Sequence, residues 1–113
     1  MTGTQQFEHA MKALGAKFSG ELPHKLQEIR HLYFAATQSA HDDASLNRLY
    51  LTLHGLAGAA RTFGHPHICD AARGLELCVA EAMRSGQAPA SASATLQLAM
   101  DKFLHACVEQ MAA

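Results

Sequence analysis

The sequence predicts an all-α fold, an antiparallel up-and-down four-helix bundle with an additional short N-terminal helix. Apolar residues make up 49% of the 113 residues, tryptophan is absent and only three prolines interrupt the chain, which is typical of packed helices. Apolar positions recur at spacings of three and four, and the links between the periodic segments are short, which favours antiparallel neighbours. The length suits one domain, so we expect residues 1–113 to form a single bundle.

The first expected helix covers about residues 4–18 and is followed by a break or bend. Gly20 and Pro23 interrupt the pattern, because the residue before a proline is pushed away from α geometry. A second helix then begins near Leu22 and ends near Ser39. We expect the short first helix to lie across one end of the bundle. The two apolar stripes are Phe7, Met11, Leu14 and Phe18, and then Leu22, Leu26, Ile29, Tyr33 and Ala36.

The third expected helix has the clearest apolar period in the chain. A polar turn over residues 39–43 precedes it, and Asp42, Asp43 or Ser45 can cap its positive end. Gly64 is expected to stop it. Its stripe consists of Leu46, Leu49, Leu53, Leu56, Ala60 and Phe63.

Two further helices complete the bundle. Pro66 suits the first turn of the fourth helix, so the link from the third is very short, and Ser85 and Gly86 end it. A loop over residues 87–91 leads to the last helix. The two stripes are Ile68, Ala72, Leu75, Val79 and Ala82, and then Leu96, Met100, Phe103 and Cys107.

Charge and cysteine content argue against several classes of function. The formal net charge is −1, so no electrostatic field is available to hold a nucleic acid. Cys69, Cys78 and Cys107 show no CxxC spacing and lie in apolar segments, which favours a reducing compartment. The N-terminus lacks the features of a signal peptide, and no apolar run approaches the ~20 residues that span a bilayer. We expect a cytoplasmic protein with no membrane or nucleic-acid partner.

His54 is the candidate functional residue. On a helical wheel it projects roughly 120° away from the leucine stripe, so we expect it to face water. Gly58 lies one turn later on the same face, although glycine inside a helix costs about 1 kcal/mol relative to alanine. Its missing side chain leaves the imidazole accessible to a bulky partner. The wheel also places near His54 the residues Asn47, Tyr50, Leu51, Ala57, Arg61 and His65.

Tyr50 and Leu51 are the candidate docking residues on this face. Both would border an exposed patch at which a partner could dock, and the alternative is that either folds against the edge of the core.

The segment from His54 to Gly64 reads His-Gly-Leu-Ala-Gly-Ala-Ala-Arg-Thr-Phe-Gly, and Ile68, Ala72, Leu75 and Glu76 follow at regular spacing. From about Leu46 to Glu76 this pattern resembles the histidine-containing phosphotransfer (HPt) domains of bacterial multistep phosphorelays. The resemblance implies that His54 is the phosphorylated histidine, Gly58 the small residue one turn later, and Gly64 the turn between the two central helices.

One position departs from the family pattern. Family members commonly have a lysine three residues after the histidine, where its charge can favour the phosphoryl group, and this sequence has Ala57 there. Packing of a small side chain is the plain account of Ala57. Arg61, two turns from His54, is the nearest substitute charge, and a solvated surface charge is an equally good account of it.

The resemblance implies a phosphoryl carrier rather than an enzyme. A neutral imidazole is nucleophilic at pH 7 and can form a covalent intermediate. The implied partners are the aspartates of response-regulator receiver domains, together with a hybrid sensor kinase. Because the receiver domains bring the Mg²⁺, we expect no cofactor on this chain. The sequence has no GxxxxGK[ST] loop and no glycine-rich kinase segment, so autophosphorylation from ATP is not expected.

Two other classes of function stay open. The first is a helix-turn-helix DNA-binding protein, because residues 59–64 loosely resemble the turn of that motif. A recognition helix should collect Lys and Arg, however, whereas residues 67–84 hold two arginines against three acidic residues. The second is a purely structural dimerisation bundle, in which replacing His54 would change nothing in signalling.

A metal site built from His54, His65, His67 and Cys69 is disfavoured. Zinc needs three or four converging ligands, and Pro66 with the start of a helix makes His65 and His67 diverge.

Overall fold

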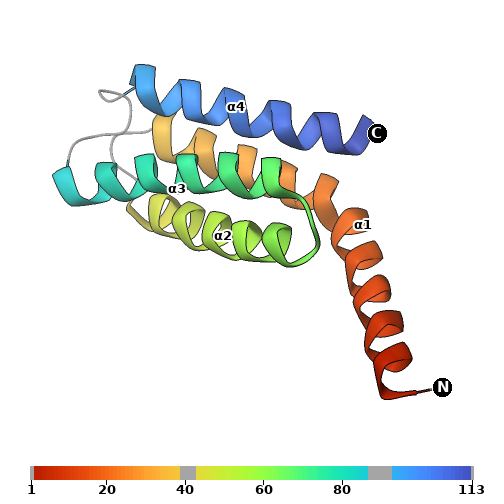
Figure 1. Ribbon diagram of the computed structural model, residues 1–113. Coiled ribbons are helices and arrows are strands. Elements are labelled where there is room, and N and C mark those ends of the chain that lie inside the picture. Colours follow the sequence, from red (N-terminus) through yellow and green to blue (C-terminus); the bar gives the residue numbers. More distant parts are fainter. Residues whose placement is uncertain (1, 39–42, 87–92, 113) are drawn as a thin grey trace.

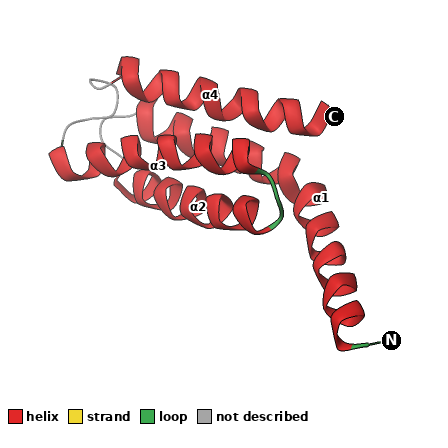
Figure 2. Cartoon of the chain, viewed as in Figure 1, coloured by secondary structure: helices red, strands yellow, loops and turns green. Residues whose placement is uncertain are grey.

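The structure, a computed structural model, describes residues 2–38, 43–86 and 93–112, and these residues form helices and no strand. The four helices are α1 (Gly3–Gln38), α2 (Asp43–Thr62), α3 (Pro66–Ser85) and α4 (Ser93–Ala112) (Figure 1 and Figure 2). The all-α prediction is confirmed. The expected cap at Asp42 and the expected loop over residues 87–91 lie outside the described residues.

α3 packs against both α2 and α4, and α1 packs against the same two helices from the other side. In Figure 1 each helix of the bundle runs in the direction opposite to the helix before it. None of the helices that the structure describes is long and apolar enough to cross a membrane.

The apolar stripes expected from Leu22 onwards supply the core. Burial of these side chains stabilises the bundle by roughly 25 cal/mol per Å² of apolar surface removed from water. The stripe positions that are almost completely buried include Leu22, Ile29, Leu49, Leu53, Ala60, Ile68, Ala72, Leu75, Val79, Phe103 and Cys107.

The prediction of a separate N-terminal helix is wrong, because α1 runs through Gly20 and Pro23 without interruption. A proline inside a helix removes one hydrogen bond, and its ring crowds the carbonyl four residues earlier, here that of Ser19. The usual result is a kink. Figure 1 shows α1 changing direction in this region, so the expected bend is present and the expected break is not.

The N-terminal part of α1, residues 3–18, is called the tail below. It does not lie across the end of the bundle as expected, but projects away from it (Figure 1). Phe18 anchors the tail, with its ring centroid 5.8 Å from that of Phe63 and 5.2 Å from that of His65. Further out, Phe7 and Leu14 are 65% and 50% exposed. The outer part of the first apolar stripe therefore does not pack against the core.

The turn between α2 and α3 fixes how these two helices face each other. Gly64 adopts a positive φ of 80°, a conformation that glycine tolerates best. The His65 N–H donates to the Ala60 carbonyl at 2.8 Å and the Gly64 N–H to the Arg61 carbonyl at 3.4 Å, which is the Schellman arrangement. Pro66 then opens α3 directly. The predictions that Gly64 stops one helix and Pro66 starts the next are confirmed.

Candidate functional site

His54 lies in the middle of α2 with its side chain 61% exposed, as expected from the helical wheel. The stripe on the opposite side of the helix is buried, with Leu53 at 0% and Leu49 at 1% exposure. Packing of these leucines against the core therefore fixes the rotation of α2, and this rotation directs the imidazole towards solvent.

Glu76 of α3 holds one edge of the His54 ring. Its Oε1 lies 3.2 Å from His54 Nδ1, and its own side chain is only 9% exposed. The two residues meet because each is eleven positions from His65 in the α2–α3 turn (65 − 54 and 76 − 65), so they lie at the same height on neighbouring helices. Among the described residues, Glu76 is the one charged side chain in the buried set.

This pairing has a consequence for the imidazole. An ionised carboxylate can only accept hydrogen bonds, so His54 Nδ1 must carry the proton that it donates to Glu76. In the neutral ring the other nitrogen, Nε2, then holds a free lone pair. Since Nδ1 faces the buried glutamate, Nε2 lies on the exposed edge of the ring. The arrangement presents a nucleophilic nitrogen to solvent.

Tyr50 stacks on His54 one turn earlier in α2, with ring centroids 6.2 Å apart and an interplanar angle of 20°. Tyr50 is half-buried and packs against the core, whereas Leu51 is 58% exposed. Of the two alternatives for these positions, Tyr50 therefore lies at the core edge and Leu51 belongs to the open surface. Tyr50 and Glu76 together limit the positions that the imidazole can take.

Gly58 lies one turn after His54 and is exposed. A Cβ added there would meet no atom within 4 Å, so packing inside this chain does not explain the absence of a side chain. Thr62 Oγ1 donates a hydrogen bond to the Gly58 carbonyl at 2.9 Å.

Ala57 and Arg61 have different surroundings. Ala57, at the position where the family commonly has lysine, is completely buried in the core. Packing of a small side chain therefore accounts for the alanine. Arg61 is exposed in the last turn of α2, where a positive charge is favourable next to the negative end of the helix.

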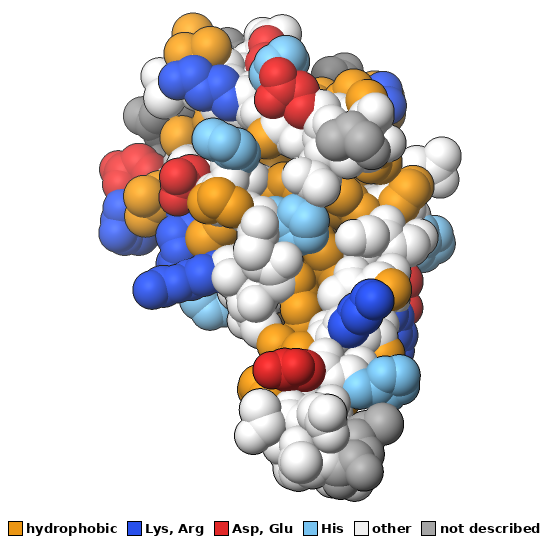
Figure 3. Space-filling view, turned by 45° about the vertical axis from the view of Figure 1, so that its right-hand side comes forward, with side chains coloured by type: hydrophobic (Ala, Val, Ile, Leu, Met, Phe, Trp, Pro, Cys, Tyr) orange, Lys and Arg blue, Asp and Glu red, His pale blue; other side chains and the backbone are white. Residues whose placement is uncertain are grey.

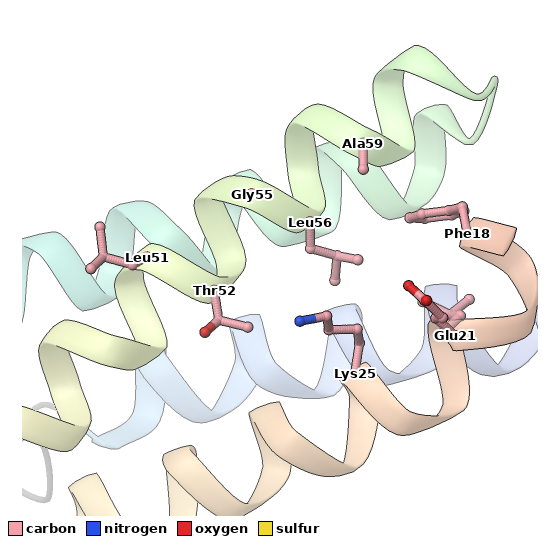
Figure 4. Close-up of a pocket in the computed structure, with 9 residues that line it drawn as sticks. Phe18, Glu21, Lys25, Leu51, Thr52, Gly55, Leu56 and Ala59 are labelled. Carbon is pink, nitrogen blue, oxygen red and sulfur yellow. The ribbon is translucent and has the colours of Figure 1, made fainter. Parts of the chain in front are cut away.

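A groove runs between α1 and α2 next to the His54 face (Figure 4). Its cavity volume is about 270 Å³. Figure 4 shows the side chains of Lys25 and Leu56 pointing into the space between the two helices, and Gly55 adds no side chain on α2. The lining residues are Phe18, Glu21, Leu22, Lys25, Leu51, Thr52, Gly55, Leu56 and Ala59.

The His65 ring stacks on Phe18 of α1. Within the described part of the chain, no three His, Cys, Asp or Glu side chains are arranged to hold a metal ion.

Glu76 is the residue of the site whose role the sequence did not reveal. The sequence does place Glu76 on the same side of the α3 apolar stripe as Cys69, and the structure shows that both residues are buried. An acidic residue at such a position needs a partner, since an unpaired buried carboxylate is costly. The identity of that partner depends on the length of the α2–α3 turn, which sets the register between the helices.

Comparison with known protein families identifies the family of this chain. The family model described as Hpt domain matches residues 13–113, nearly the whole chain. Searches of curated proteins and of solved structures found no match. The chain therefore belongs to the Hpt domain family, whose members carry phosphoryl groups on a histidine in phosphorelays.

Proposed function

We propose that His54 is the residue that becomes phosphorylated, and that residues 1–113 act as one unit relaying phosphate between the aspartates of receiver domains. The observation that supports this best is the exposed His54 ring whose Nδ1 is held by the buried Glu76 carboxylate. A hybrid sensor kinase is the proposed origin of the phosphate.

The proposed transfer is a displacement at phosphorus. The Nε2 lone pair of His54 attacks the phosphorus of an aspartyl phosphate, the Nε2–P bond forms, and the P–O bond to the aspartate breaks with the electron pair leaving on the carboxylate. Transfer to a second receiver reverses these steps. Covalent catalysis of this kind splits one difficult transfer into two easier ones.

Glu76 is the positioning residue in this mechanism. When Nε2 bonds to phosphorus while Nδ1 keeps its proton, the ring becomes an imidazolium. The Glu76 carboxylate at 3.2 Å then stabilises the new positive charge, as the aspartate does in a Ser-His-Asp triad. Tyr50 supports the ring from its stacked position.

The chain is proposed to act as a carrier without a kinase site or cofactor of its own. The partner receiver domain supplies Mg²⁺ and its own lysine to the phosphoryl group. With Ala57 buried, no cation of this chain stands at the position of the common family lysine. Arg61 lies seven residues from His54, about 10 Å along the helix axis, so its supporting role is to attract the anionic partner rather than to contact the phosphoryl group.

The test is transfer of labelled phosphate from receiver domains that carry ³²P on their aspartate. Wild type should acquire acid-labile, base-stable label, and His54→Gln should acquire none. The matched control is His31→Gln, which removes an exposed histidine on α1 and should be labelled like wild type. Equal labelling of His54→Gln and wild type, or no labelling of wild type by any receiver, would contradict the proposal.

A further inference from the structure

The tail of α1 carries an apolar stripe whose outer part the bundle does not cover. We call Phe7, Met11, Leu14 and Phe18 the tail stripe. Phe7 is 65% exposed and Leu14 50% exposed, and the residues before Ala13 lie outside the part of the chain that matches the family. An exposed apolar stripe on a helix that projects from a bundle is typical of a surface that another molecule covers.

The tail stripe faces the side of the molecule where α2 lies. The tail leaves the bundle at the end where α2 meets α3, and extends past α2 on the side opposite α4 (Figure 1). Gly15 and Phe18, which belong to the same helical face, lie against Phe63 at this end of α2. Spacings of four, three and four keep the outer stripe residues on that face. The tail stripe and the outer surface of α2 therefore face a common space next to the bundle.

The tail stripe is also continuous with the surface around His54. Phe18 ends the stripe and lines the α1–α2 groove, and the other wall of that groove includes Gly55 and the exposed Leu51. In Figure 3 hydrophobic side chains continue from the projecting tail into the body of the molecule. Because phosphoryl transfer needs direct contact, a partner that reaches His54 must cover this neighbourhood.

Charge favours a phosphorylated partner over a second copy of the tail. Residues 3–18 contain Lys12 and Lys17 against Glu8, a net charge of +1 (2 − 1, histidine neutral). The phosphoryl group that a receiver domain presents is anionic, whereas a second tail would bring the same excess of positive charge.

We propose that the receiver domain that exchanges phosphate with His54 also packs an apolar patch against the tail stripe, so that the tail sets the affinity for the partner without taking part in the chemistry. This inference rests on the proposed function.

The test compares a tail variant with a matched surface control. Phe7→Gln/Leu14→Gln replaces two exposed apolar side chains by a good helix former. Leu98→Gln/Val108→Gln does the same on α4, at residues that are 55% and 53% exposed. Initial rates of ³²P transfer from a phosphorylated receiver, measured over a range of receiver concentrations, separate KM from kcat. Circular dichroism checks that both variants keep their helices, and Phe7→Gln alone serves as a milder variant.

The tail variant should raise KM about tenfold and leave kcat unchanged, because apolar contacts made equally in the bound state and the transition state act on binding alone. The control should behave like wild type. A KM that stays at the wild-type value would overturn the inference, and so would wild-type dimers in sedimentation that become monomers in the tail variant while KM is unchanged.

The same assay distinguishes the two proposals. Transfer that requires His54 but is indifferent to the tail removes only this inference. Absence of transfer to wild type from every receiver removes the proposed function, and this inference with it.

Discussion

At the level of single residues, the proposed transfer depends on one proton between His54 and Glu76. Replacing Glu76 by Ala removes the acceptor for Nδ1–H, and hydrogen bonds to charged groups are worth about 1.5–3 kcal/mol. We expect the rate of transfer to fall about ten- to hundredfold. The Nε2–H tautomer of His54 should gain population in ¹⁵N spectra, a change that loss of packing alone would not produce.

Glu76→Gln is the conservative control for this prediction. Its amide oxygen still accepts a hydrogen bond from Nδ1–H, so the tautomer of His54 should stay as in wild type. Because the negative charge is lost, the rate of transfer should still fall, but by less than in Glu76→Ala. A Glu76→Ala protein with wild-type rate and tautomer would show that the carboxylate only fills space.

Gly58 gives a second prediction at this scale. Because a Cβ there meets nothing within 4 Å, Gly58→Ala should stabilise the protein by up to about 1 kcal/mol in denaturant unfolding. Gly58→Gln should also fold, but should slow transfer by obstructing the partner. Gly74 of α3 has the same open surroundings, so Gly74→Gln is the matched control and should transfer normally. If Gly58→Gln transfers at the wild-type rate, the glycine has no role in access.

Features of single residues that depend on one helix alone could be predicted from the sequence. The exposure of His54 and the stop at Gly64 follow from the wheel of a single helix and from glycine's tolerance of positive φ. The pairing of Glu76 with His54 was missed because it joins two helices, and the register between helices is set by a turn whose hydrogen bonds the sequence does not specify.

At the scale of elements, the tail of α1 depends on one contact cluster. Phe18 packs against Phe63 and His65, and the tail residues further out are mostly exposed. Phe18→Ala should therefore speed amide hydrogen exchange in residues 4–14 and leave exchange in α3 almost unchanged, since local opening follows the loss of local packing. Equal acceleration in α3 would mean that the tail is an integral part of the bundle.

The continuity of α1 could not be predicted from its breakers alone. Pro23 removes one backbone hydrogen bond, but the bonds on both sides of it survive, and Leu22 and Leu26 are held in the core directly beside it. The balance between a bend and a break thus depends on tertiary packing. The apolar stripes of α2, α3 and α4 were predictable because each of them buries against neighbours along its whole length.

At the scale of the whole molecule, the core stabilises the neutral form of a buried thiol. Burial raises the pKa of Cys107 from 9.0 to about 11. The unfolded chain therefore loses this proton more readily than the folded protein, and the contribution to stability is present below pH 9 and disappears as the pH rises towards 11. We expect the free energy of unfolding to fall over this window by at most about 3 kcal/mol. Burial and the nearby Asp101 raise the pKa of Tyr33, which acts in the same direction.

Denaturant unfolding at several pH values measures this effect. Cys107→Ala should flatten the decline between pH 9 and 11, even though its stability at pH 7 is lower. A decline of unchanged steepness in Cys107→Ala would assign the effect to other groups.

In the proposed mechanism, Nε2 of His54 carries the phosphoryl group while Nδ1 keeps its proton towards Glu76. The most direct measurement is ³¹P and ¹⁵N NMR of the ¹⁵N-labelled protein after phosphorylation by a receiver domain that carries an aspartyl phosphate, with the bonded nitrogen identified from its coupling to phosphorus. We expect one phosphohistidine, at His54, bonded through Nε2. A phosphorus bonded to Nδ1 of His54, or a phosphoryl group on any other side chain, would contradict it.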